Sequence, residues 1–289
     1  MKPLIYISDG KTYDLSDNQF HMFVCFSDKV EDELLEEGHH YSLKEFEKYI
    51  DSAHPCSMRI KFETQEEFEY LIDQIHSFVT SLDVIAKHNR PFDLTPLETC
   101  SELESVQFYW NTKQEKLWDV QKNSKLKFFQ MMDYYKVADF SAFRGSSIED
   151  LRLFGCNGCG SFVSKMHITD LRFILDMPNL QKLSLDIIKD ESSAYYLELF
   201  AKCHKLTELN VPDNFFTFQQ FAWLKSNMPN VKNGLECVFR GDDFFSIIGK
   251  RTPKNLQDEA KALKYQIKYD LLIEKYKTRS IPPTDDEKD

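Results

Sequence analysis

Glycine is scarce in this chain, and positive charge is outweighed by negative charge. There are 9 glycines among 289 residues, and no G-x-G-x-x-G, G-x-S-x-G, Walker or H-E-x-x-H motif occurs. The net charge of −11 would repel nucleic acid and anionic membrane surfaces. We therefore expect a non-catalytic protein with no cofactor, no metal, no nucleic-acid partner and no membrane partner.

Long apolar runs are absent as well. No stretch approaches the roughly 18 residues that a membrane-spanning helix needs. The apolar stretch at residues 4–7 meets Asp9 and Gly10 before it reaches the length of a secretory leader. The 7 cysteines are an odd number and favour free thiols in a reducing compartment. We expect a cytoplasmic protein.

What is present instead is a recurring phrase: an apolar residue, two positions, a second apolar residue, one position, and a third. Neighbouring phrases start roughly two dozen residues apart, except for one longer step from Ile148 to Leu180. A period of about 20–29 residues with this phrase is typical of one repeat class. The phrases begin at Val79, Leu103, Leu126, Ile148, Leu180 and Leu206.

The array is expected to start before the first clear phrase and to end after the last. Met58-x-Ile60-x-Phe62 alternates like a strand, and we expect its second half to align with Leu82-x-Val84 of the first phrase. Between them, Thr64 and Glu67 have the spacing of a capping box and predict a helix start. At the far end, Val231 continues the register one period after the last phrase.

The segments that precede the phrases also resemble one another. Leu97-x-x-Cys100-x-x-Leu103 is echoed at Cys203, and Met177-Pro178-Asn179-Leu180 is echoed at Met228. Residues from about 55 to 240 thus resemble the leucine-rich repeat superfamily, including its cysteine-containing repeats. The resemblance implies a right-handed curved solenoid with a parallel concave sheet, a mostly helical convex side and, usually, protein ligands. The 24 Phe and 13 Tyr residues predict aromatic side chains at many core positions.

The predicted fold class is therefore α/β, with four segments. Residues 1–54 are expected to form an N-terminal α+β cap, with strands near residues 4–7, 12–15 and 21–26 and a helix from Ser42. Residues 55–248 form the solenoid, residues 253–278 a C-terminal capping helix, and residues 280–289 a flexible tail. The predicted apolar stripe of the last helix consists of Leu256, Ala260, Leu263, Ile267 and Leu271.

The residues between the phrase positions should line the concave face, because alternate strand residues point to opposite sides. One column runs through Asp83, Gln107, Gln130 and Arg152 and reads as a solvated polar row. The next column is apolar over four strands, and apolar patches with aromatic residues mark interaction sites. The predicted partner-binding residues are Ile85, Tyr109, Trp110, Phe128, Met132, Arg152 and Phe154.

Several alternatives remain open from sequence alone. A terminus could fold over the apolar column, or Trp110 could turn into the core. Cys156-Asn157-Gly158-Cys159, in the longest step of the array, or His39-His40 could belong to an enzyme or a metal site, although Cys156 also fits a structural turn position. A third reading is a structural subunit assembled through the C-terminal helix. Otherwise we expect a monomer or weak oligomer that binds an unidentified protein.

Overall fold

A computed structural model describes residues 5–9, 22–26, 39–86, 89–155, 165–241, 244–250 and 258–287. The chain divides into two units, Met1–Pro178 (unit 1) and Asn179–Asp289 (unit 2), which are considered in turn. Both units belong to the α/β class, as expected from the sequence. Among the described residues, every helix is too short or too polar to cross a lipid bilayer.

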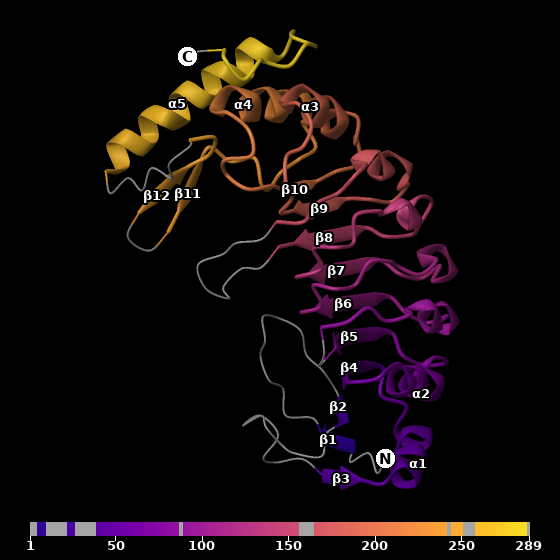
Figure 1. Ribbon diagram of the computed structural model, residues 1–289. Coiled ribbons are helices and arrows are strands. Elements are labelled where there is room, and N and C mark those ends of the chain that lie inside the picture. The colour runs from indigo at the N-terminus through magenta and orange to yellow at the C-terminus, as the bar shows by residue number, and fades with distance from the viewer. Residues whose placement is uncertain are drawn as a thin grey trace. The chain divides into compact units, whose positions relative to one another are not determined.

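Parallel strands at nearly constant spacing form the centre of unit 1 (Figure 1). The second apolar residue of each phrase pairs with its counterpart in the neighbouring strand, as Val106 does with both Leu82 and Phe129. Phe129 in turn pairs with Leu151, so the phrase predicted the strand register correctly here. The strands are β4 (Ser57–Phe62), β5 (Ser81–Ala86), β6 (Ser105–Tyr109), β7 (Phe128–Met132) and β8 (Asp150–Phe154).

The expected alignment of β4 was wrong by two positions. Leu82 was expected to lie opposite Ile60, but it pairs with Met58, and Ile60 pairs with Val84. The error has a simple cause: a strand that alternates with period two keeps the same face inward when it shifts by two positions. Met58-x-Ile60 and Ile60-x-Phe62 fit the phrase equally well, and the backbone pairing selects the first.

A repeated backbone arrangement precedes the strands. The carbonyl of Glu104 accepts two amides of the next repeat, from Lys127 at 2.8 Å and Phe128 at 3.1 Å. The carbonyls of Cys56, Thr80 and Lys127 do the same in unit 1, and the carbonyl of Gln181 does so in unit 2. The same local geometry thus recurs at each of these repeats, whatever the side chain.

The connections between the strands form a row on one face of the sheet. The first is a true helix, α2 (Gln65–Ile75), which has the expected capping box of Thr64 and Glu67. The later ones contain only 3₁₀ turns. Each of these elements contacts the next. They are η2 (Thr95–Thr99), η3 (Val120–Lys122), η4 (Ser141–Phe143) and η5 (Leu171–Asp176).

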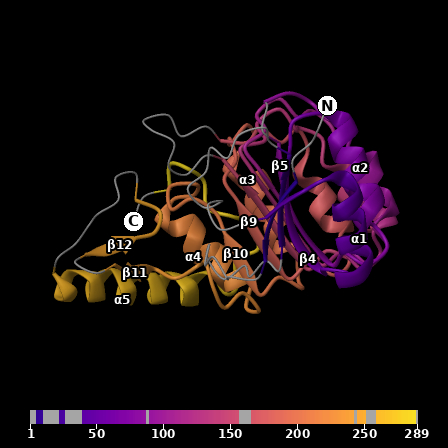
Figure 2. The same ribbon diagram turned by 90° about the horizontal axis from the view of Figure 1, so that it is seen from below.

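The N-terminal segment extends this sheet. Strand β1 (Ile5–Asp9) is antiparallel to both β2 (Met22–Phe26) and β3 (His39–Tyr41), and β2 pairs in parallel with β4. Helix α1 (Leu43–Ala53) begins at the expected capping box of Ser42 and Glu45. Figure 2 shows α1 beside α2 on the same face, called the α2 face below. The strand expected at residues 12–15 lies outside the described residues.

Aromatic side chains fill the layer between the strands and the connections that lie on the α2 face, as the composition predicted. Phe129 of β7 packs edge-on against Phe143 of η4, with ring centroids 4.7 Å apart, and Phe143 continues the contact to Phe173 of η5. Phe108 and Trp118 are also fully buried in this layer, 5.6 Å apart. Because each of these rings removes a large apolar area from water, the layer is a major source of stability.

Unit 2 repeats the pattern with α-helical connections. Two short parallel strands pair Leu183 with Leu209, the second apolar residues of their phrases. Glu208 forms a bridge to Asn233, in the register expected from Val231. The elements of this unit are β9 (Lys182–Leu185), α3 (Ser193–Ala201), β10 (Glu208–Asn210), α4 (Phe218–Asn227), the hairpin of β11 (Val238–Arg240) and β12 (Phe245–Ile247), and α5 (Glu259–Tyr276).

Helix α5 buries a different face from the one that the sequence predicted. Ala262, Tyr269 and Tyr276 are buried, and the Tyr269 hydroxyl donates to the Leu235 carbonyl at 3.0 Å. The expected stripe points outward: Leu263, Ile267 and Leu271 are 58%, 53% and 67% exposed. Tyr269 and Tyr276, seven residues apart, both bury their rings, and Tyr269 also provides a hydroxyl for a carbonyl, which the aliphatic stripe cannot do. Leu256 lies outside the described residues.

The segment after α5 has specific contacts, although the sequence predicted a flexible tail from Ser280. The indole nitrogen of Trp223 donates to the Arg279 carbonyl at 2.9 Å, and Arg279 binds both carboxylate oxygens of Glu287, at 2.6 and 2.8 Å. Pro282 and Pro283 are buried. No local pattern indicates the anchor at Trp223, because it is distant from the tail in the chain.

The turn before β7 depends on one buried amide. Asn123 occupies the place that Cys100 takes one repeat earlier, and its Nδ2 donates to the carbonyls of Leu97 (2.8 Å) and Cys100 (2.9 Å). Its Oδ1 accepts from the Trp118 indole at 2.6 Å. The corresponding turn of the next repeat contains Ser146, whose buried hydroxyl has no hydrogen-bond partner among the described residues.

We expect Asn123→Ala to lower the free energy of unfolding by about 3 kcal/mol, because it removes three buried hydrogen bonds and leaves the Trp118 indole nitrogen unpaired. Ser146→Ala is the matched control and should change it by less than about 0.5 kcal/mol, since it removes a hydroxyl that is already unpaired. Urea unfolding of the two variants measures both values. Equal losses in the two variants would contradict this account.

Candidate functional site

The predicted apolar column is a continuous row in the structure. Tyr109 pairs with Ile85 on one side and with Met132 on the other, and Met132 pairs with Phe154. These residues alternate along their strands with core residues of the α2 face, so their side chains lie on the opposite face of the sheet. The sequence therefore placed these four residues next to one another correctly.

Exposure differs along the row. Ile85 is only 7% exposed, so it is part of the interior rather than of an open surface. Tyr109, Phe128, Met132 and Phe154 are partly exposed. Trp110 is 54% exposed, which rules out the alternative that it turns into the core. The open part of the row, here called the Tyr109–Phe154 surface, consists of Tyr109, Trp110, Phe128, Met132 and Phe154.

Trp110 is held outward by an unusual backbone conformation. Its φ is +62°, in the left-handed region that bulky residues rarely adopt. Its amide donates to the Met132 carbonyl at 3.2 Å, and its ring lies 5.7 Å from the Tyr109 ring. The equivalent residue of the next strand, Asp133, has φ +66°, whereas the equivalent residue of the preceding strand, Ala86, has a negative φ. At Trp110 the left-handed conformation directs a large apolar ring into solvent.

The polar column beside this surface is not a solvated row, contrary to expectation. Asp83 is fully buried, and Gln107 and Gln130 are 3% and 8% exposed. The Tyr109 hydroxyl donates to Gln107 Oε1 at 2.9 Å, and Gln130 Nε2 donates to that hydroxyl at 3.4 Å. The first bond lies within β6 and the second joins β7 to β6, and together they fix the orientation of the Tyr109 ring.

An ion pair lies at the β4–β5 end of the polar column. Arg59 Nη2 lies 2.7 Å from Asp83 Oδ2, and its Nε lies 3.2 Å from the same oxygen. Burial nevertheless raises the pKa of Asp83 to about 6, despite the opposing effect of Arg59. The Arg59 guanidinium also lies 5.9 Å from the centre of the Tyr109 ring. Burial, followed by the negative charge of Asp83, raises the pKa of Tyr109 to about 12, so its hydroxyl is neutral.

A second arginine lies at the β8 end of the column. Arg152 binds Asp150 through two hydrogen bonds, at 3.0 and 2.9 Å, and its guanidinium lies 5.0 Å from the centre of the Phe128 ring. Arg152 is partly exposed, as the prediction of a binding residue requires. The site is thus an apolar centre with an arginine on each side.

The enzyme and metal alternatives gain no support from the described residues. Cys156 and Cys159 lie outside them, as do the side chains of His39 and His40. Within the described ranges, no group of three His, Cys, Asp or Glu residues is placed to hold a metal ion. Burial raises the pKa of the thiols of Cys100, Cys203 and Cys237 to about 12, which keeps these groups protonated and unreactive.

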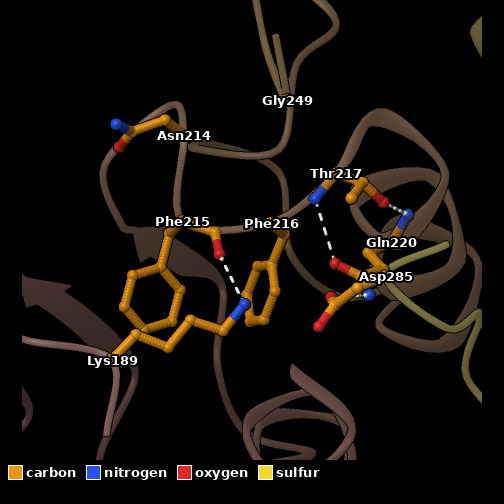
Figure 3. A pocket seen from close by; sticks show the side chains of 8 residues that line it. All are labelled: Lys189, Asn214, Phe215, Phe216, Thr217, Gln220, Gly249 and Asp285. Atoms are coloured by element: carbon orange, nitrogen blue, oxygen red, sulfur yellow. Dashed lines mark hydrogen bonds between the residues drawn. The ribbon is translucent and has the colours of Figure 1, made fainter. Parts of the chain in front are cut away.

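Unit 2 contains a cavity of about 240 Å³ that the sequence did not predict (Figure 3). Lys189 donates to the Phe215 carbonyl at 3.0 Å and lies 5.2 Å from the centre of the Phe216 ring. Burial lowers the pKa of Lys189, and the negative charge of Asp285 opposes that shift. Asp285 is also a lining residue, so the chain's own C-terminal segment forms one wall of the cavity.

That wall is held by a buried glutamine. Gln220 is fully buried, and its Nε2 donates to Asp285 Oδ1 at 2.9 Å and to the Pro283 carbonyl at 3.0 Å. Its Oε1 accepts from the Thr217 amide at 3.0 Å, and Ser193 donates to Asp285. These groups recognise a carboxylate, and the chain itself supplies one. Because Asp285 is 92 residues from Ser193, no local pattern could have revealed the pairing.

No protein-family model matches this chain, and no curated protein matches it. The Tyr109–Phe154 surface is the site that both the sequence pattern and the strand register define.

The strain at Trp110 can be measured with two substitutions that remove the same ring. At ordinary positions alanine is at least as stable as glycine, but at φ +62° the order should reverse. We expect Trp110→Gly to be more stable than Trp110→Ala by about 1 kcal/mol, because only glycine adopts this conformation without steric cost. Thermal or urea unfolding gives the difference. A more stable alanine variant would show that the backbone at this position is relaxed.

The raised pKa of Asp83 makes stability depend on pH. Because its pKa in the folded protein is about 6, above its ordinary value of 3.8, folding is accompanied by proton uptake near pH 5. The contribution of Asp83 protonation to the free energy of unfolding is therefore largest at low pH and is lost as the pH rises through 6. We expect the stability of the native protein relative to Asp83→Asn to increase by about 1.4 kcal/mol from pH 7.5 to about pH 5. A pH-independent difference between the two proteins would contradict the assignment.

Proposed function

We propose that this protein is a non-catalytic interaction module that binds a partner protein through the Tyr109–Phe154 surface. In this proposal the parallel strands belong to a right-handed leucine-rich repeat solenoid, and the surface lies on its concave face. The agreement between the phrase positions and the strand pairing supports the solenoid. The recurring joints at Cys100 and Cys203 support the resemblance to that superfamily.

One observation carries the proposal: three neighbouring strands present Tyr109, Met132 and Phe154 in register and partly exposed. Adjacent strands lie about 4.8 Å apart, so these side chains form one continuous patch. Trp110 adds the largest side chain at its edge. Aromatic and methionine side chains beside arginine are the composition of binding hot spots.

The backbone of Trp110 supports a functional reading of the same patch. A left-handed conformation at a bulky residue costs about 1–2 kcal/mol, and strain of this kind is concentrated at functional sites. An exposed tryptophan gains little in the isolated chain that would offset this cost. In a complex, the ring would be buried and the strain would be compensated by the contact.

The chemistry of the cysteines fits a cytoplasmic setting for this interaction. The cysteines whose side chains the structure describes are Cys56, Cys100, Cys203 and Cys237, and all four are thiols. Disulfides are the rule in oxidising compartments and rare in the cytosol. We therefore include a reducing, cytoplasmic location in the proposal.

Site-specific crosslinking tests the proposed surface. A photoreactive phenylalanine analogue at Trp110 should crosslink a discrete partner from the source cytosol, and Phe154→Asp should reduce that product at least tenfold. The matched control carries the same analogue at Leu175, which is 42% exposed in η5, and should give no such product.

Two outcomes would contradict the proposal. The first is a product that forms equally from positions 110 and 175, which indicates non-specific contact. The second is a specific product from position 110 that Phe154→Asp leaves unchanged, because a partner on this surface must contact both residues. The unfolding midpoint of each variant should be recorded so that loss of folding is recognised.

A further inference from the structure

The segment that follows α5 lies in a groove of unit 2 and is held there through its backbone. The indole nitrogen of Trp223 donates to the carbonyl of Arg279, and Gln220 Nε2 donates to the carbonyl of Pro283. Both donors belong to α4 and are three positions apart, so they lie on one side of the helix. Trp223 is 2% exposed and Gln220 is fully buried. The bound segment, residues 278–287, is called the anchored tail below.

A pair of prolines in the anchored tail suits this kind of recognition. Pro282 and Pro283 are buried. Proline fixes its own φ and keeps the residue before it out of the helical region, so this part of the chain is extended before it is bound. Proline also lacks an amide donor, so a groove that binds it must donate to carbonyls, as Trp223 and Gln220 do. Extended proline-rich segments beside aromatic side chains are a common mode of peptide recognition.

A carboxylate fixes the far end of the anchored tail. Asp285 Oδ1 accepts from Gln220 at 2.9 Å (Figure 3) and also from Ser193, the first residue of α3, which is 3% exposed. The ammonium group of Lys189 lies beside the same carboxylate. Asp285 itself is exposed, so the recognising amide and hydroxyl belong to the core and the recognised group lies at the surface. The groove therefore binds a proline pair that is followed, two residues later, by a carboxylate.

The anchored tail fills this groove only in part. The cavity of about 240 Å³ lies beside Asp285, and Lys189, Phe215 and Phe216 are among its other walls. A volume of this size has room for several water molecules or for a larger acidic side chain. Residues 278–287 contain no helix and no strand, so they can leave the groove while the helices and strands of unit 2 stay in place.

We propose that this groove binds a segment of a partner protein in which a proline pair precedes an acidic residue, and that the anchored tail is its internal competitor. Because the tail is tethered, its effective concentration at the groove is high, and a partner must displace it. A partner that also fills the cavity gains contact area that the tail lacks. The groove lies in unit 2 and the Tyr109–Phe154 surface in unit 1, so the two proposals are tested separately.

Fluorescence anisotropy with a labelled peptide of residues 278–287 tests the groove. Asp285→Lys places a second ammonium group beside Lys189 and releases the tail, so we expect it to bind the peptide at least tenfold more tightly than the native chain does. Asp286→Lys is the matched control, because it makes the same charge change at the next exposed position, and it should bind as weakly as the native chain. Equal binding by the two folded variants, or binding by neither up to about 1 mM peptide, overturns the proposal.

A second measurement uses the native chain and does not depend on how a variant folds. Excess unlabelled peptide, added to the native chain labelled with nitrogen-15, should displace the tail, so that the amide resonances of residues 284–287 become narrow. The peptide that carries Asp285→Asn should require at least a tenfold higher concentration, because the charge-assisted hydrogen bonds from Ser193 and Gln220 are lost. Equal displacement by the two peptides, or no displacement at about 1 mM peptide, overturns the proposal and makes the tail a fixed part of unit 2.

Discussion

Backbone hydrogen bonding between neighbouring parallel strands is the constraint on which the rest of unit 1 depends. It fixes the offset of each repeat, and the offset decides which side chains stand beside one another. The doubly accepting carbonyl before each strand, as at Glu104, sets the start of the next strand independently of its sequence. Once this register exists, the aromatic core residues lie together on one face of the sheet, and the row from Ile85 to Phe154 lies on the other.

The same register explains why polar residues are buried beside that row. Gln107, Gln130 and Asp83 stand on adjacent strands, and together with Tyr109 and Arg59 they satisfy much of one another's hydrogen bonding. A buried polar network is stabilising only when its members are paired. Asp83 retains one oxygen without a hydrogen-bond partner among the described residues, and burial raises its pKa. The network holds the Tyr109 ring in place next to the strained Trp110.

Much of the strand register was predictable from sequence, because the spacing of the apolar residues and the backbone pairing both depend on the residue offset between neighbouring strands. The capping boxes at Ser42 and Thr64 were predictable for a similar reason: a few neighbouring residues contain the whole signal. The error at β4 arose where a period of two left the register ambiguous.

The buried face of α5 could not be read in the same way. Helical spacing alone cannot say which of two apolar stripes packs against the rest of the fold. The Tyr269 side is buried, and its hydroxyl donates to the carbonyl of Leu235, which is distant in the chain. The tail contacts of Asp285 and Arg279 also depend on partners far away in the chain or on backbone groups that carry no sequence signal. For the candidate site, the sequence identified the row of side chains but not the burial of Ile85 or the backbone strain at Trp110.

Collisional quenching of tryptophan fluorescence tests the central claim most directly. The chain has three tryptophans, and Trp118 and Trp223 are 1% and 2% exposed while Trp110 is 54% exposed. The account predicts that acrylamide readily quenches one fraction of the tryptophan fluorescence of the isolated protein. This fraction should be absent in Trp110→Phe. In the native chain it should be shielded when the partner identified by crosslinking is bound non-covalently. Uniform shielding of all three tryptophans in the isolated protein, or a quenchable Trp110 that a bound partner leaves unchanged, would contradict an open binding surface at this site.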